Sequence, residues 1–231
     1  MAAKRKLVVL TGAGISAESG LKTFRDSGGL WEGYDVETVA SPDGWQRDPR
    51  LVLDFYNIRR KDVLNASPNK AHTELAALES FFDISIITQN IDDLHERAGS
   101  SHVLHLHGEI LKMRSVADEH RLYDVKGDIH LGDLADDGFQ LRPHVVWFGE
   151  AVPMIGKAVQ EIVQADIFVL VGSSLNVYPA AGLLDFVPRS AAMFVVDKQI
   201  PPTHHFPAMH RIEKPATEGL PELRQKLLAL L

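Results

Sequence analysis

The sequence predicts an α/β fold built on a parallel sheet, and three observations indicate it. Short apolar runs rich in β-branched residues recur along the chain, several end at a turn of glycine or polar residues, and helical patterns lie between them. Buried parallel strands are typically near-continuous apolar runs, and alternation of such runs with helices is the pattern of a parallel sheet.

Five apolar runs are expected to form the strands of this sheet. They cover residues 7–10, 84–87, 103–106, 167–171 and 193–196. A helix is expected after Ser67, because Ser67 and Pro68 supply a cap and a first-turn proline ahead of apolar residues at helical spacing. Two further helices are expected over 154–163 and 220–231.

Two segments interrupt the alternation and predict a smaller, inserted domain. Residues 31–65 contain a turn sequence at 41–44 and then an amphipathic pattern over 51–64, while residues 113–141 are polar and punctuated by glycines. The larger domain is therefore expected to comprise residues 1–30, 66–112 and 142–231.

Composition excludes several classes of protein. The 231 residues contain no cysteine, which excludes disulfides, thiolate zinc sites, iron–sulfur clusters and a cysteine nucleophile. The net charge of −7 opposes binding to a phosphate backbone, so no nucleic-acid partner is expected. No apolar stretch is long enough for a signal peptide or a membrane span, so a cytoplasmic protein without a membrane partner is expected.

A glycine-rich turn follows the first expected strand. It begins with Gly12 and Gly14 and continues through Ser16 to Gly20. Glycines let a backbone approach a ligand closely, and amides at a helix N-terminus suit a pyrophosphate. The spacing differs from the dinucleotide fingerprint G-x-G-x-x-G. Nucleotide binding and simple packing of a strand on a helix therefore both remain open from these residues.

Polar residues also follow the next expected strand, at the edge of the sheet where ligands bind in open α/β folds. Gln89, Asn90 and Asp92 could hold ribose hydroxyls and a carboxamide. Turn chemistry is the alternative, and it accounts for Asn90 and Asp92 but not for Gln89.

Two histidines end the following strand. Alternation places His105 and His107 on one face, and His107 precedes Gly108, where it could reach a ligand. An imidazole that titrates near neutrality suits a general base for a hydroxyl, and a purely structural histidine is the alternative.

Two later segments complete the pattern. Residues 172–174 form a second Gly/Ser turn after a strongly apolar run, which could bind phosphate or ribose. Residues 142–150 are apolar and extended, and they fit either an ordinary buried strand or an edge that pairs with an extended peptide.

Taken together and in chain order, these motifs resemble the sirtuins, a family of NAD-dependent protein lysine deacylases. The resemblance covers residues 7 to about 216 and rests on 12–25, 88–92, His107–Gly108, 146–150 and 172–174. It implies a Rossmann-like sheet with helices on both faces, plus a small lobe made of a helical module and a zinc module. NAD, the co-substrate, and an acyl-lysine protein or peptide would meet between the two.

The resemblance assigns NAD-binding roles to four groups of residues. The first group surrounds the phosphates and the nicotinamide ribose, the second the ribose and carboxamide, the third the phosphates and adenosine ribose, and the fourth the adenosine. In that order they are Gly12, Ala13, Gly14, Ser16, Glu18, Phe24, Arg25 and Trp31; Gln89, Asn90, Ile91 and Asp92; Gly172, Ser173, Ser174 and Asn176; and Asp197, Lys198, Gln199 and Ala216.

The resemblance also implies a mechanism. The acyl oxygen attacks the anomeric carbon as nicotinamide leaves, His107 deprotonates a ribose hydroxyl, and the products are nicotinamide, free lysine and O-acyl-ADP-ribose. The substrate backbone would pair with Val146, Trp147, Phe148 and Gly149.

The preferred acyl group is expected from Tyr56 and Arg59, which stand at i and i+3 on one helix face. From these residues alone, an exposed basic face with Arg60 and Lys61 is the favoured interpretation. In the sirtuin branch that resembles bacterial desuccinylases, a Tyr-x-x-Arg at this place binds the carboxylate of succinyl-lysine. The resemblance thus predicts removal of succinyl groups, and of acetyl groups as well.

The chain departs from the family in its zinc module. Sirtuins carry two cysteine pairs before the substrate strand, whereas Ser115 stands near the first expected position here and cysteine is absent throughout. No metal is expected, and apolar contacts are expected to hold the lobe of a monomeric protein. Two alternatives remain: a mono-ADP-ribosyltransferase or NAD glycohydrolase, and a non-catalytic sensor of NAD or ADP-ribose.

Overall fold

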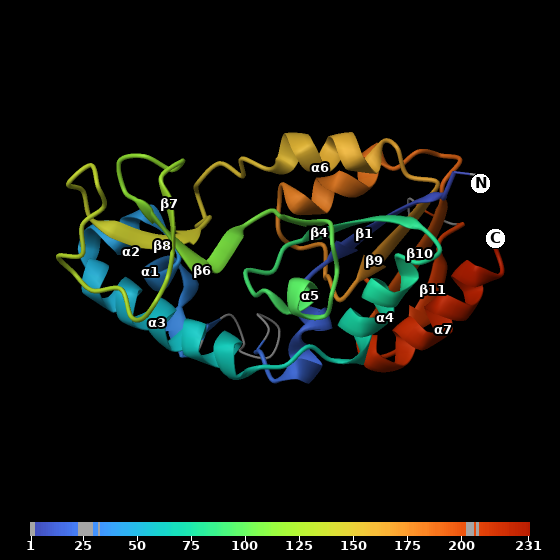
Figure 1. Cartoon of the computed structure of the whole chain (residues 1–231), viewed down its shortest axis with the longest axis horizontal. Coiled ribbons are helices and arrows are strands. Elements are labelled where there is room, and N and C mark those ends of the chain that lie inside the picture. The colour runs from blue at the N-terminus through green and yellow to red at the C-terminus, as the bar shows by residue number, and fades with distance from the viewer. Residues whose placement is uncertain (1–2, 23–29, 32, 202–205, 207) are drawn as a thin grey trace.

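The computed structural model describes residues 3–22, 30–31, 33–201, 206 and 208–231. A six-stranded sheet forms one end of an elongated molecule, and a small lobe forms the other (Figure 1). The strand order is β11-β10-β9-β1-β4-β5, and every pairing in this sheet is parallel. The predicted α/β fold is confirmed.

The five expected apolar runs all form strands of the sheet. They form β1 (Lys6–Thr11), β4 (Asp83–Thr88), β5 (Val103–His105), β9 (Ile167–Val171) and β10 (Ala192–Asp197), and the sixth strand is β11 (His210–Glu213). Strand β11 was not predicted, because it is an edge strand in which only Ile212 is buried and it therefore has no apolar run.

Both faces of the sheet are covered, which explains why its strands are apolar throughout. In β1, Leu7 and Val9 belong to the core beneath α4 (Lys70–Leu78) and α7 (Ala216–Leu228). Val8 and Leu10 belong to the opposite core, with α6 (Ile155–Ile162) and the 3₁₀ segment η3 (Ala180–Phe186).

Two segments at the start of helices differ from the prediction. Asn69, not Ser67, caps α4: its side chain accepts from the amide of Ala71 at 2.9 Å, and it also donates to the carbonyl of Ile15 at 2.8 Å. The second contact ties the helix start to the glycine-rich turn. The sequence expected as a turn at 41–44 begins a short helix, α2 (Pro42–Arg47), which Ser41 caps.

The small lobe consists of helices and an antiparallel sheet. Its elements are the hairpin β2 (Leu30–Trp31) and β3 (Tyr34–Asp35), the helices α1 (Val36–Val39), α2 and α3 (Pro49–Asn65), and the strands β6 (Gly108–Ser115), β7 (Leu122–Asp124) and β8 (Leu141–Val145). The boundaries expected at 112–113 and 141–142 cut through this sheet, because the β6–β8 ladder continues to the pair Gly108 and Val145.

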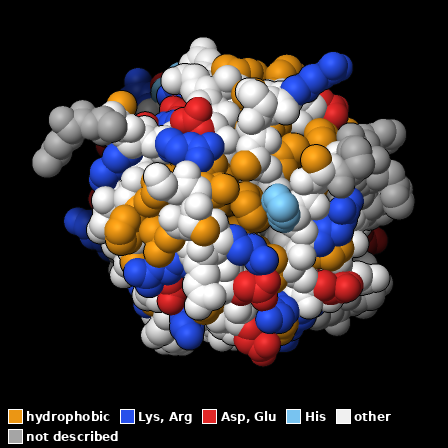
Figure 2. Space-filling model, turned by 90° about the vertical axis from the view of Figure 1, so that its right-hand side faces the viewer, with side chains coloured by type: hydrophobic (Ala, Val, Ile, Leu, Met, Phe, Trp, Pro, Cys, Tyr) orange, Lys and Arg blue, Asp and Glu red, His pale blue; other side chains and the backbone are white. Residues whose placement is uncertain are grey.

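The parallel strands are directed at the lobe. Strand β1 starts beside the N-terminus and runs toward the lobe, so the carboxyl ends of all the parallel strands face it (Figure 1). Figure 2 shows the opposite end, where the termini lie and apolar side chains are interspersed with charges of both signs. No helix within the described ranges is long and apolar enough to cross a membrane.

Two apolar clusters pack inside the lobe, and buried polar contacts supplement them. The larger one lies around Phe55 of α3 and Ile110 of β6, and the smaller one consists of Leu53, Ile129, Ala135 and Leu141. Beside it, the buried Asn57 of α3 donates to the carbonyl of Ile129 and accepts from its amide, both at 2.9 Å. These contacts attach the loop after β7 to α3.

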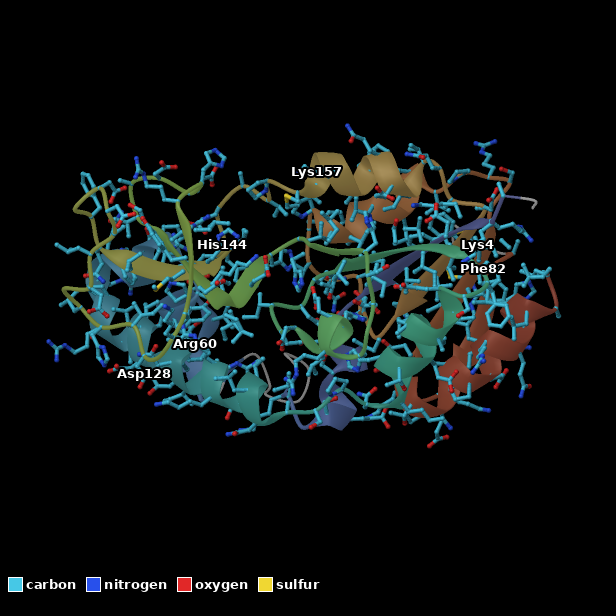
Figure 3. All side chains as sticks on the ribbon, viewed as in Figure 1. Lys4, Arg60, Phe82, Asp128, His144 and Lys157 are labelled. Carbon is cyan, nitrogen blue, oxygen red and sulfur yellow. The ribbon has the colours of Figure 1, made fainter. Side chains whose placement is uncertain are left out.

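Arg60 extends this contact. Its Nη1 donates to Asn57 Oδ1 at 2.7 Å and its Nε donates to the carbonyl of Ile110 at 3.0 Å. Burial lowers the pKa of Arg60 to about 10. The nearby carboxylate of Asp128 opposes this shift. Figure 3 shows Arg60 and Asp128 close together in the small lobe. Asn57 and Arg60 thus join α3, β6 and the loop at 125–130.

Replacing Asn57 by alanine is expected to lower the free energy of unfolding by about 2–4 kcal/mol, because it leaves the amide and carbonyl of Ile129 buried without their partner. Urea denaturation measures this effect. Ile58→Ala, an exposed position on the same helix, is the control and should change stability by less than about 0.5 kcal/mol. Equal stability of the two variants would show that apolar contacts alone hold the lobe.

Candidate functional site

A cavity of about 320 Å³ lies between the carboxyl ends of the parallel strands and the small lobe. Residues that follow β1, β4, β9 and β10 line one side. Side chains of α3 and the segment after β8 line the other. Ligands bind at this edge of open α/β sheets.

The cavity brings together most of the residues expected from the sequence. Those that line it are Gly12, Ala13, Gly14, Ser16, Tyr56, Arg59, Gln89, Asn90, Ile91, Asp92, His107, Val146, Trp147, Phe148, Gly149, Gly172, Ser173, Ser174, Asp197, Lys198 and Ala216. They come from segments as far apart in the chain as Gly12 and Ala216.

Three expected residues lie elsewhere. Glu18 is exposed and accepts from the amide of Thr217 at 3.0 Å, so it attaches the glycine-rich turn to α7. Asn176 and Gln199 are exposed and do not line the cavity. Phe24 and Arg25 lie outside the described residues, and Trp31 is described only as backbone of β2.

Other lining residues were missed. Leu21, Lys22, Ala40, Val63, Glu150, Val152, Val177, Tyr178 and Pro179 are among them. Two signals could have found some of these: Val63 stands one helical turn after Arg59, and residues 177–179 directly follow the second Gly/Ser turn.

The glycines of the two turns allow the turns to pack on each other. The amide of Gly14 donates to the carbonyl of Gly172 at 2.9 Å. A Cβ on Gly12 would lie 2.7 Å from that carbonyl oxygen, and Gly172 has a φ of +61°, a conformation that favours glycine. Close packing of the two turns therefore explains why these positions are glycine. The cavity lies beside the packed turns.

Ser16 organises the polar floor of the cavity. It is 2% exposed, donates to Asp92 Oδ2 at 3.1 Å and accepts from Asn90 Nδ2 at 3.1 Å. Burial raises the pKa of Asp92, while its hydrogen bonds to the amide of Leu94 and to Ser16 oppose the rise. These hydrogen bonds hold the three polar side chains in fixed positions relative to one another.

Two buried histidines lie beneath this floor. The His72 and His95 rings pack edge to face with centroids 5.0 Å apart, and His95 Nε2 lies 3.0 Å from Thr11 Oγ1. Burial lowers the pKa of His72 to about 4, so His72 is neutral at pH 7. This position agrees with a structural role.

His107 lies at the cavity wall with one ring nitrogen fixed. Its Nδ1 is 2.9 Å from the carbonyl oxygen of Gln89, an atom that can only accept, so Nδ1 carries the hydrogen. The neutral ring then has its lone pair on Nε2. Burial lowers the pKa of His107, and the bond to Gln89 opposes this, so the neutral form prevails at pH 7.

The lobe side of the cavity contains a buried phenol and a buried guanidinium. Tyr56 accepts from the indole Nε1 of Trp147 at 3.1 Å, and burial raises the pKa of Tyr56, so it stays protonated. Arg59 is 6% exposed. The interpretation as an exposed basic helix face is wrong for Arg59 and Arg60, because α3 packs against the small sheet, and it holds for Lys61 only.

The extended run at 142–150 divides into two parts. Its first part is buried strand β8, whereas residues 146–149 leave the sheet and line the cavity. Arg142 lies over the Trp147 ring, 3.1 Å from the centroid, and donates to Glu150 Oε1 at 2.7 Å. Glu150 Oε2 in turn accepts from the amide of Trp147 at 2.8 Å. These contacts fix the segment.

Comparison with known proteins identifies the family. A model described as the Sir2 family matches residues 12–179. The chain belongs to the Sir2 family. The resemblance to sirtuins found in the sequence is confirmed.

Several relatives and solved structures cover nearly the whole Sir2 chain. An NAD-dependent protein deacylase of Bacteroides thetaiotaomicron is 54% identical over 230 residues, 97% of this chain and 98% of that protein. One of Helicobacter pylori is 50% identical over 226 residues, 98% and 99% of the two chains. A Sir2 homologue solved with NAD has a TM-score of 0.87 at 38% identity and covers 98% of this chain and 91% of its own. A Sir2 protein solved with a propionylated peptide has a TM-score of 0.79 at 31% identity, covering 96% and 93%.

Metal ligands were not expected in this Sir2 protein. Within the described ranges, no three histidine, aspartate or glutamate side chains are grouped so that they could hold a metal ion. Ser115, at the place of the first expected zinc ligand, is buried at the end of β6, and its hydroxyl accepts from the amide of Ala117 at 3.1 Å. The absence of zinc stays a prediction.

Proposed function

We propose that the protein is an NAD-dependent protein-lysine deacylase that removes succinyl groups, and acetyl groups as well. The products would be nicotinamide, free lysine and O-acyl-ADP-ribose. One observation carries the proposal: Tyr56 and Arg59 line the same cavity as His107 and the polar residues at the strand ends. The deacylase names of relatives with 50–54% identity support the reaction class.

The polar side of the cavity fits NAD. Bound NAD supplies a nicotinamide–ribose bond whose cleavage makes the ribose carbon an electrophile for the acyl oxygen, and an ADP-ribose that carries the acyl group away. Gln89, Asn90 and Asp92 offer amide and carboxylate groups suited to ribose hydroxyls and a carboxamide. Ser173 and Ser174 suit the phosphates, and Asp197 at the end of β10 suits the adenosine ribose.

His107 fits the role of general base. Because its Nδ1 hydrogen is bonded to Gln89, its Nε2 can accept a proton from a ribose hydroxyl. The lowered pKa keeps Nε2 unprotonated at neutral pH. A non-catalytic sensor of NAD would not need a base oriented in this way.

Tyr56 and Arg59 fit the carboxylate at the end of a succinyl chain. Guanidinium presents paired donors that match a carboxylate, and the protonated Tyr56 hydroxyl can add a third while it accepts from Trp147. Ala40, Val63 and Val145 supply apolar walls for the chain. Burial strengthens such an ion pair because little water competes for it.

The substrate peptide would lie along residues 146–149. The amides of Val146, Trp147 and Phe148 already donate to His107, Glu150 and Ala40. A peptide backbone would therefore pair with the carbonyl groups of this segment and with the backbone of Gly149. This is a smaller set of backbone groups than the sequence implied. Phe148, 45% exposed, would pack on the lysine chain.

The test uses three peptides that differ only in the lysine acyl group: succinyl, its terminal carboxamide analogue, and acetyl. Mass spectrometry with and without NAD should show NAD-dependent removal of all three. The succinyl peptide should exceed the carboxamide analogue by about 10- to 100-fold in kcat/KM, because the analogue loses charge-assisted hydrogen bonds worth about 1.5–3 kcal/mol.

Each other outcome contradicts part of the proposal. Equal rates for the succinyl and carboxamide peptides would remove the carboxylate specificity but leave the deacylase. Nicotinamide release with all peptides intact would instead indicate a mono-ADP-ribosyltransferase or an NAD glycohydrolase. NAD binding without nicotinamide release would indicate a sensor.

A further inference from the structure

Two histidines donate to consecutive carbonyl groups of the same cavity wall. His107 Nδ1 lies 2.9 Å from the oxygen of Gln89, and His105 Nδ1 lies 3.0 Å from the oxygen of Asn90. His107 lines the cavity, whereas His105 does not. The other nitrogen of His105, Nε2, lies 2.8 Å from Glu96 Oε1 on the short helix α5 (Leu94–Arg97).

The wall that these histidines hold is central to the site. The amide of Gln89 donates to the carbonyl of Thr11 at 2.9 Å, and its side chain donates to Ser173 Oγ at 2.9 Å. Asn90 Nδ2 donates to Ser16 at 3.1 Å. A shift of the backbone at 89–90 would therefore move the Asn90 carboxamide and the His107 ring together.

We propose that His105, clamped between Glu96 and the carbonyl of Asn90, is a positioning residue for the deacylation reaction. It fixes the backbone at residues 89–90, and through it the Asn90 carboxamide and the orientation of His107. This inference rests on the assignment of His107 as the base in the proposed function.

The clamp requires a protonated imidazole. A neutral ring has one N–H, so it would turn a lone pair either to the Asn90 carbonyl or to the Glu96 carboxylate, and both contacts repel. The imidazolium donates to both. Its side chain is 8% exposed, so water does not readily replace either partner.

The surrounding charges favour that protonated form. Burial lowers the pKa of His105, but the hydrogen bond and charge of Glu96, the bond to Asn90 and the charge of Glu109 together raise it above its ordinary value. Asp92 and His95 also face His105. Glu109 is paired with Lys112 at 2.9 Å, and the pKa of His95 lies well below its ordinary value, so Glu96 is the dominant partner.

The two histidines consequently need opposite protonation states. His107 must be neutral to accept a proton, so kcat falls on the acid side as it becomes protonated. His105 must be charged to hold the wall, so its contribution is complete at low pH and is lost as the pH rises through its raised pKa. The alkaline limit of activity should therefore depend on the His105–Glu96 pair.

Three variants test the clamp on an acetyl-lysine peptide with saturating NAD. Glu96→Gln removes the charge, and its amide can accept from a protonated ring or donate to Nε2 of a neutral ring, so the clamp should no longer depend on protonation and the alkaline limb of kcat should disappear. His105→Asn keeps a donor at the Nδ1 position, and should abolish that limb while kcat near pH 7 falls less than tenfold. His105→Phe removes both contacts, and should lower kcat about tenfold or more with little change in the peptide KM.

His102→Asn is the matched control. His102 also faces a glutamate, with Nε2 3.6 Å from Glu161, but it lies at the amino ends of the strands, away from the cavity. This variant should keep the wild-type pH profile. If the His105 variants lower only the melting temperature and keep the profile and kcat, His105 is structural and the inference is wrong. The same follows if Glu96→Gln, a change at a half-exposed side chain, keeps the alkaline limb of the wild type. Inactivity of the wild-type protein would instead contradict the proposed function.

Discussion

Replacing His107 by alanine is expected to lower kcat for deacylation by about 10²- to 10⁴-fold, the range typical for loss of a positioned general base. NAD binding should persist, because Ser16, Asn90 and Asp92 hold one another without His107. Nicotinamide exchange into NAD should fall less than deacylation does, since in the proposed mechanism the base acts after nicotinamide leaves. Quantifying both reactions on one acetyl peptide separates the two steps.

The control for His107→Ala is His130→Ala, an exposed histidine of the small lobe. It should retain wild-type kcat. A His107→Ala enzyme that deacylates within tenfold of the wild type would contradict the assignment of His107 as the base.

The pH dependence of kcat/KM should also show that a base acts in the reaction. A base works unprotonated, so the rate falls as the pH drops through its pKa. Burial lowers the pKa of His107 below the ordinary 6.5, which places the acid limb of kcat/KM below pH 6.5. An acid limb above pH 6.5 would mean that another group controls the rate.

The sequence predicted the sheet side of the site well because one rule governs it. Parallel strands present their carboxyl ends at one edge, so polar residues placed just after apolar runs meet there. Ser16, Gln89 and Ser173 follow three different strands and meet in one cavity. The rule fails for Glu18 and Gln199, because at these positions, beyond the ends of their strands, the chain has turned away from the edge of the sheet.

The lobe side could not be predicted from residue patterns alone. Arg59 and Arg60 look exposed in the sequence, since arginine is rarely buried, and their burial depends on strands β6 and β8, about 50 and 80 residues later. Strand β11 was missed for a related reason: its neighbour β10 defines it, not its own hydrophobicity. The role proposed for Arg59 comes from the resemblance to sirtuins and not from periodicity.

Replacing Arg59 by methionine is expected to lower the ratio of succinyl to acetyl kcat/KM about 100-fold. Truncating one partner of a buried, hydrogen-bonded charge pair costs about 2–5 kcal/mol, and here the succinyl carboxylate would be left without its counter-charge. Most of the loss should appear in KM, because the carboxylate lies far from the reacting bond and is held equally before and during the reaction.

Two further substitutions give this result its meaning. Arg59→Lys keeps the charge but loses the paired donors, so its ratio should fall between the wild type and Arg59→Met. Lys61→Met removes a charge from the same helix, but that ammonium group is exposed and pairs with Asp128 at 2.8 Å outside the cavity, so the ratio should not change. If Arg59→Met and Lys61→Met give the same ratio of succinyl to acetyl kcat/KM, no side chain of α3 binds the succinyl carboxylate. Selectivity would then have to come from the mouth of the cavity, where water weakens any charge that could attract a succinyl group.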